Sequence, residues 1–123
     1  MYPPVFPAVA ASSAAVALLK TGTGPIRFFQ FGLAPQNVQK PYAVWQRIFG
    51  TPENYLGDTP DIDSFTLQID VYASSADSAR TVAAALRDAI EPVAHITSWL
   101  GESVDPETLN NRFGFQCDFW TPR

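Results

Sequence analysis

The single histidine and the single cysteine are the first residues whose chemistry needs to be considered. His95 has no second histidine to share a metal ion, and Cys117 has no cysteine partner at the spacing of a metal site. The two would form a nucleophilic pair only if their strands were neighbours in a sheet. Cys117 alternates with three phenylalanines, however, and an apolar site raises the pKa of a thiol instead of activating it. We therefore expect a core cysteine, and a strand histidine that packs or is solvated.

Four acidic residues stand close together in the middle of the chain: Glu53, Asp58, Asp61 and Asp63. A calcium ion needs six or more oxygen ligands, which a tightly turned loop of twelve residues provides. The spacing of the four residues does not match such a loop, and prolines interrupt it. We interpret the segment as a solvated acidic loop and predict no metal and no cofactor.

Other motifs give no support to an enzyme. Residues 22–24 (Gly-Thr-Gly) are not followed by the lysine and serine or threonine that begin the helix after a phosphate-binding loop. The sequence contains neither the nucleophile turn of a hydrolase nor a paired carboxylate site. We predict that the protein has no catalytic residues.

The composition is that of one folded domain with an acidic balance. Of the 123 residues, 46% are hydrophobic and 16% charged, so a packed core in a single domain over residues 1–123 is expected. The net charge is −4, and the eight lysines and arginines are scattered. Binding to nucleic acid requires clustered basic residues that displace counterions from phosphates. The sequence therefore argues against a nucleic-acid binder and suits a surface past which DNA slides.

The sequence has no apolar run of the roughly 18 residues that a membrane span needs. The apolar stretch 5–19 lacks the preceding basic region of a secretion signal. One cysteine cannot form an internal disulfide. We expect a soluble protein that is made in the cytoplasm and has no membrane contact.

Periodicity and turn residues predict the elements of the first half. A helix over residues 5–20, broken at the serines 12–13, leads to a strand over 26–31. A strand over 42–49 carries apolar residues on both faces, which is typical of a central strand covered on both sides. The segment 50–62 is rich in proline, glycine and aspartate, and we predict a long loop there.

The second half begins with the clearest strand, residues 64–73, in which apolar and polar side chains alternate without error. A helix capped by Ser74 or Ser75 follows and ends at Pro92. Its apolar stripe consists of Ala79, Val82, Ala83, Leu86 and Ile90. Strands are predicted over 93–100 and 112–120, joined by a turn-rich connection over 101–111.

These elements predict an α+β fold with two layers, in which an antiparallel sheet of about four to five strands carries the helices on one face. Two large aromatic residues, Tyr72 and Trp120, fall on the polar sides of their strands, beside Asp70 and Asp118. Tyr and Trp are enriched at protein interfaces. Cover by the chain's own loops or first helix is the alternative explanation, and the sequence leaves both open.

Three segments together resemble the small tail completion, or tail terminator, proteins of siphophages. The first is the alanine-rich helix that ends before Arg27 and Phe28. The second is the run 41–47, which reads PYAVWQR, and the third is the run 67–73, which reads LQIDVYA and precedes a long helix. With the closing aromatic strand, the resemblance covers almost the whole chain. The acidic segment between the second and third runs is longer than is usual in this family.

The resemblance implies a structural virion protein without catalytic residues. Such proteins form a ring, commonly a hexamer, on the head-proximal end of the tail tube. The ring stops polymerisation of the major tail tube protein and presents a surface to the head-tail connector or stopper protein. DNA passes through its lumen without specific binding. The protein would be assembled in the cytoplasm of the bacterial host and would become part of the virion tail.

For a ring we expect contacts with neighbouring subunits or the tube, and an interface in which two different patches meet. The edge strand near 26–31 is one candidate patch, and the polar face that holds Tyr72 and Trp120 is the other. The lumen is expected to be neutral to acidic. The hypothetical interface residues are Arg27, Arg47, Glu53, Asp58, Asp61, Tyr72, Arg112 and Trp120.

Three other functions are alternatives to the terminator. A connector or head-closure ring protein has the same size and fold class. A small ligand-binding or enzymatic α+β domain would carry a pocket between sheet and helices, and native mass would distinguish it from a ring. A regulatory nucleic-acid binder is disfavoured by the charge.

Overall fold

The computed structural model describes residues 5–34, 38–55, 58–104 and 110–122, and for 49–55, 58–64 and 120–122 it describes the backbone only. The helices and strands in chain order are α1 (Val5–Ala10), α2 (Ser13–Leu19), β1 (Phe28–Gln30), β2 (Tyr42–Tyr55), β3 (Asp58–Ala73), α3 (Ala76–Ile90), β4 (His95–Val104) and β5 (Asn111–Pro122).

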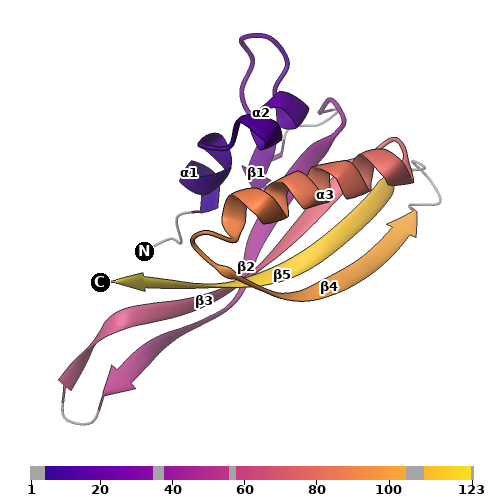
Figure 1. The fold of residues 1–123 in the computed structure, drawn as a ribbon. Coiled ribbons are helices and arrows are strands. Elements are labelled where there is room, and N and C mark those ends of the chain that lie inside the picture. Colours follow the sequence, from indigo (N-terminus) through magenta and orange to yellow (C-terminus); the bar gives the residue numbers. More distant parts are fainter. Residues whose placement is uncertain (1–4, 35–37, 56–57, 105–109, 123) are drawn as a thin grey trace.

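The strands form one sheet in the order β1-β2-β3-β5-β4, and the helices lie on one side of it (Figure 1). This arrangement confirms the predicted α+β class. The sheet is mixed and not antiparallel throughout, because β1 runs parallel to β2 whereas the other neighbours are antiparallel. Because the two strands are parallel, Tyr42 begins β2 at the same end of the sheet at which Phe28 begins β1.

The break predicted at the serines 12–13 is confirmed. Ser12 caps α2, and its hydroxyl accepts a hydrogen bond of 3.3 Å from the backbone N–H of Ala15. The cap satisfies an amide that has no partner inside the helix. Val9 of α1 and Leu19 of α2 are fully buried, so both short helices belong to the layer that covers the sheet.

α3 packs against the centre of the sheet through the predicted stripe, and every residue of that stripe is at most 2% exposed. Ser75 caps the helix, since its hydroxyl accepts from the N–H of Ser78 at 3.1 Å. On the sheet side, the alternation of β3 buries Leu67, Ile69 and Val71 completely. The core lies between these two sets of side chains.

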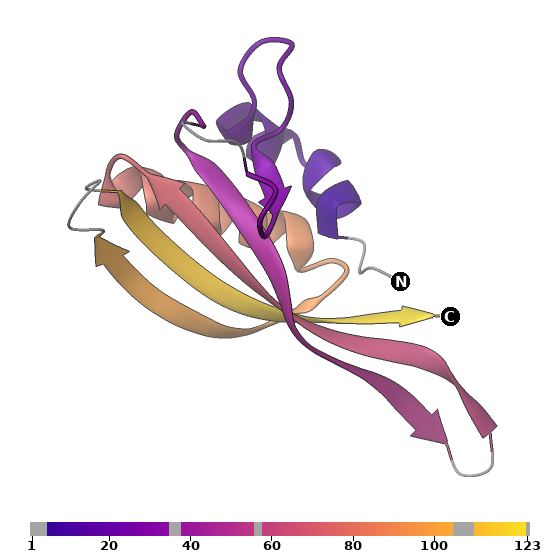
Figure 2. The same ribbon diagram turned by 180° about the vertical axis from the view of Figure 1, so that it is seen from behind.

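The opposite face of the sheet has no described helix over it (Figures 1 and 2). The expectation that β2 is covered on both sides is therefore wrong. Ile48 is 43% exposed, and Tyr42 and Val44 are only half-buried. Of these residues, Tyr42 stacks on Tyr72 of β3 within the sheet face.

The predicted loop over 50–62 is also wrong, because β2 and β3 continue through its described residues as a long hairpin. The two strands stay paired from Phe49↔Thr66 out to Tyr55↔Asp58. Prolines are tolerated here because β2 has no second neighbour beyond its pairing with β1, which ends at Trp45. Pro60 lies where the register shifts, and β-bulges accept proline. We call residues 49–55 and 58–65 the arm; it extends well beyond the helices (Figure 2).

β4 runs on to Val104, so the turn-rich connection begins later than predicted. Gly101 has a φ of +86°, a conformation that favours glycine. It lies at a register shift between β4 and β5, so the glycine makes a β-bulge and not a turn.

Truncation of Leu86 to alanine should lower the free energy of unfolding by about 2–5 kcal/mol, because it leaves a cavity in the core between α3 and β3. Urea denaturation would measure the loss. Asp88→Ala is the control on the same helix, since the Asp88 side chain is 69% exposed and its removal should cost less than about 0.5 kcal/mol. Equal effects of the two substitutions would contradict the packing described here.

Candidate functional site

A buried carboxylate marks the centre of the uncovered sheet face. Asp70 of β3 is only 7% exposed, although no described helix covers it. Arg112 of β5 donates to Asp70 Oδ1 from Nε at 3.1 Å and from Nη2 at 2.8 Å. Gln68 donates its amide to both carboxylate oxygens, at 3.3 and 3.1 Å. A charge this well buried is held in place by partners that satisfy both of its oxygens.

Gly114 leaves the space that Asp70 occupies. The two residues are paired across β3 and β5. A Cβ atom on Gly114 would lie 2.7 Å from Asp70 Oδ1 and 3.4 Å from Leu100 Cβ. A glycine inside a strand often marks such a close approach.

Two stacked tyrosines continue the polar cluster toward β2. The rings of Tyr42 and Tyr72 lie 5.1 Å apart at an interplanar angle of 20°. Burial, and then the charge of Asp70, raise the pKa of Tyr72, whose hydroxyl also hydrogen-bonds Arg112. We call Tyr42, Gln68, Asp70, Tyr72 and Arg112 the sheet-face cluster. It joins β2, β3 and β5 into one ordered surface.

A second contact extends this surface along the same strands. The hydroxyl of Thr66 on β3 donates to Asp118 Oδ1 on β5 at 2.7 Å. Together with the cluster, it makes the uncovered face polar but internally paired. Such a surface has the paired and ordered side chains of a protein interface.

The described residues offer little for catalysis. Cys117 is fully buried, and burial together with nearby Asp118 raises the pKa of its thiol to about 12. β4 and β5 are indeed neighbours, with Ile96 opposite Cys117, but the thiol points into the core and His95 is exposed. The expected core cysteine is confirmed. Within the described ranges no cluster of metal-binding side chains occurs, and no helix is long and apolar enough to cross a membrane.

The structure brings together two of the residues predicted for an interface, Tyr72 and Arg112, which are paired across β3 and β5. Arg47 lies apart from them, on β2, where its exposed guanidinium is 5.7 Å from the centre of the Phe65 ring. It borders a shallow hollow of about 260 Å³ that is also lined by Gln30 and Phe31.

Arg27 holds its own chain together. It is only 8% exposed, and its guanidinium donates to the carbonyl of Pro41 at 2.9 Å, the hydroxyl of Thr21 at 2.8 Å and the carbonyl of Leu18 at 3.3 Å. These bonds tie the end of α2 to the beginning of β2. Its donors are used inside the subunit.

The other predicted residues lie on or beside the arm. Glu53 is on β2, whereas Asp58 and Asp61 are on β3. Trp120 is on β5 opposite Ser64. Their side chains lie outside what the structure describes. The same holds for the side chains of the acidic segment that was compared with a calcium-binding loop.

The sequence pattern does not indicate that Gln68, Asp70, Tyr42 and Gly114 belong to one site. Asp70 and Tyr72 do share a face by alternation, but their proximity to Arg112 depends on the pairing of β3 with β5. The glycine between two phenylalanines of β5 was the available signal.

Comparison with known proteins bears on this geometry. Residues 4–121 match the protein-family model described as tail completion protein gp17. A solved structure with a similar fold is a chain from the "Virion of native gene transfer agent (GTA) particle". It is 14% identical, with a TM-score of 0.64 over 97% of this chain and 92% of that chain, so the likeness concerns the fold. No curated protein matches the sequence.

Substitution of Gly114 by alanine should destabilise the protein by about 1–3 kcal/mol, because the new methyl group displaces Asp70 from its bonds with Arg112. Chemical denaturation would measure it. In an Asp70→Ala background the same substitution should cost clearly less, since the displaced carboxylate is absent. Equal costs in both backgrounds would show that the two residues are not coupled.

Cys117 should resist thiol reagents in the folded protein. At about pH 8 a buried thiol with a strongly raised pKa has almost no thiolate, and the thiolate is the reactive form. We expect no modification by a chromogenic disulfide reagent until denaturant is added, and complete modification afterwards. Rapid reaction of the native protein would contradict the placement of Cys117 in the core.

Proposed function

Since the chain belongs to the family of tail completion protein gp17 and is a structural protein of phage tails, we propose that it is the terminator that caps the head-proximal end of the tail tube. Capping ends the polymerisation of the tube protein. It also creates the surface that the head-tail connector binds.

The uncovered sheet face is the observation on which this proposal depends. The sheet-face cluster is ordered before any partner arrives, because Asp70 and Arg112 are already paired and the tyrosines are already stacked. Side chains fixed in this way lose little entropy on binding. Tyrosine and arginine are also the residues that most often dominate protein contacts. We assign this face, with Tyr72 and Arg112, to contact with other tail proteins.

The arm supplies a second kind of contact. Between Ile62 and the tip of the hairpin, the described residues of the arm belong to β2 and β3 alone, because Ile62↔Pro122 is the last described pair of β3 with β5. Unpaired strand edges bind other extended segments through backbone hydrogen bonds. We assign the arm, with Glu53, Asp58 and Asp61, to the tube or to a neighbouring subunit.

The proposed assembly is a ring, most simply a hexamer. A cap with the symmetry of the tube offers the same contact to every tube subunit, and several weak contacts together give stable capping. The chain's charge of −4 suits a neutral to acidic lumen, since a basic lining would hold the DNA that passes through it.

A variant with a short arm should fold but fail to complete tails. Residues 53–62 would be replaced by Asn-Gly, which favours a tight hairpin turn between Pro52 and Asp63. The variant should unfold cooperatively like the wild type, because the core is untouched. In cells infected by a phage that lacks its own copy, it should leave tubes longer than normal and infectious yield near zero.

Electron micrographs and plaque counts would measure both effects. The matched control keeps the length of the arm but removes its negative charge, through Glu53→Gln, Asp58→Asn and Asp61→Asn. It distinguishes an effect of arm length from an effect of arm charge. Normal yield with the short arm would show that the arm makes no essential contact. Location of the protein at the portal, or its absence from the head-proximal tail end, would favour a head-closure protein and overturn the terminator.

A further inference from the structure

The exposed large apolar side chains among the described residues fall into two groups, at opposite edges of the sheet. One group borders β1 and the other borders β4, the two end strands of the sheet order. The β1 edge consists of Phe6, Phe31, Leu33 and Ile48, and the β4 edge consists of Val93, Trp99, Leu100 and Val104. Each of these side chains is 40–68% exposed.

The β1 edge gathers exposed apolar side chains from α1, from the end of β1 and from β2. Phe6 of α1 stacks on Phe28 of β1, with ring centres 6.4 Å apart. Phe31 and Leu33 follow β1 directly and are 67% and 68% exposed. Ile48 lies on β2 just beyond the last pair with β1. Apolar groups gathered in this way mark a contact surface, whereas scattered ones need no explanation.

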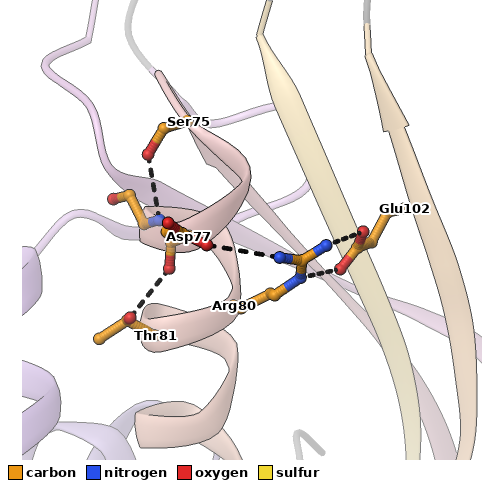
Figure 3. A network of polar contacts seen from close by, with 6 residues as sticks. Ser75, Asp77, Arg80, Thr81 and Glu102 are labelled. Atoms are coloured by element: carbon orange, nitrogen blue, oxygen red, sulfur yellow. Dashed lines mark hydrogen bonds and ion pairs between the residues drawn. The ribbon is translucent and has the colours of Figure 1, made fainter.

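An exposed ion pair links the β4 edge to α3. Arg80 of α3 donates through two nitrogens to the carboxylate of Glu102 on β4, one bond being 2.8 Å, and it also contacts Asp77 (Figure 3). This bond lowers the pKa of Glu102. Trp99 lies beside the pair, 5.4 Å from the Phe113 ring, in a hollow of about 280 Å³. The β4 edge therefore combines exposed apolar side chains with a hollow that Trp99 and Phe113 line together with Arg80, Arg87 and Glu102.

The two edges carry opposite charge. Residues 1–52 contain four basic residues and no acidic one, so their net charge is +4. On the β1 side, Lys20, Lys40 and Arg47 are exposed. Residues 76–104, which form α3 and β4, carry a net charge of −2. Their acidic residues are Asp77, Asp88, Glu91 and Glu102, and their basic residues are Arg80 and Arg87.

We propose that the β1 edge of one subunit binds the β4 edge of a second copy of this chain. This inference rests on the ring in the proposed function and names the surfaces that close it. Both halves of a complementary contact, apolar and oppositely charged, are present on one chain. A tube or connector protein as the occupant would explain either edge but not their match.

The contact must be heterologous, with different surfaces meeting. Two β1 edges would bring like positive charges together, and two β4 edges would bring like negative charges together, which is unfavourable. The edges also lie at opposite ends of the sheet order. Repetition of such a contact therefore continues from copy to copy until a ring closes. The sheet-face cluster stays available for the other tail proteins.

Disulfide trapping between two variants of the full chain tests the proposal. Leu33→Cys and Val104→Cys each place a thiol on an exposed position of one edge, and buried Cys117 does not compete. Mixed at high concentration under mild oxidation, they should form a mixed dimer about tenfold faster than either forms a dimer with itself, owing to the local concentration of thiols. Salt at roughly 0.5 M should reduce the difference, because it screens the charges.

The random-collision control pairs Leu33→Cys with Ser74→Cys, which places a thiol on an exposed position between β3 and α3, outside both edges. Equal rates for all pairs would overturn the proposal, as would faster linkage of two identical variants. A second measurement uses two variants, each with a charge that blocks one of the two edges. Leu33→Asp and Val104→Asp should each remain monomeric, whereas their mixture should form a one-to-one dimer through the one intact pair of edges.

The outcomes separate this inference from the proposed function. If mixed dimers form selectively but tails have normal length without the protein, the contact between the edges is supported and the terminator function is contradicted. If linkage is random but tubes are overlong without the protein, the terminator function is supported and the contact between the edges is contradicted.

Discussion

The strict alternation of β3 is the constraint on which the structure depends. The two faces of β3 differ in chemistry. Leu67, Ile69 and Val71 close the core under α3, whereas Gln68, Asp70 and Tyr72 form the opposite surface. A shift of one residue in its pairing would exchange the two sets. The ion pair of Asp70 with Arg112 and the stack of Tyr72 on Tyr42 exist only in the present register. These two contacts therefore help to specify the register of β3, as the buried residues do on the opposite face.

The helices and strands whose apolar residues recur at regular spacing were predictable from the sequence. β3 and α3 appear because their apolar residues recur without interruption, and the cap at Ser12 follows from ordinary helix chemistry. The arm was missed because its prolines and glycines indicate turns, and only the neighbouring strand explains why they are tolerated. The parallel direction of β1 was missed because a sequence pattern carries no information on strand direction.

The candidate site was predictable only in part, for a related reason. Tyr72 is predicted as an aromatic residue on the polar face of its strand, whereas Arg112 is predicted only as an arginine for subunit contacts. Their contact with each other depends on which strands are neighbours. Arg27 shows the opposite case. A basic residue between two segments looks available for a partner, yet three acceptors of its own chain surround it. A charged group becomes buried when segments that are distant in the sequence pack around it. The spacing of residues within one segment does not reveal this packing.

The narrowing of the arm to two strands has a consequence for its dynamics. A two-stranded hairpin is marginally stable in water when no third strand or helix supports it. We therefore expect the backbone hydrogen bonds between Ile62 and the tip of the hairpin to open locally without unfolding of the domain. Their amide hydrogens should exchange faster than those of β3 under α3. A docked partner that adds a strand would slow this exchange. The arm would then report, amide by amide, whether the particle around it has been completed.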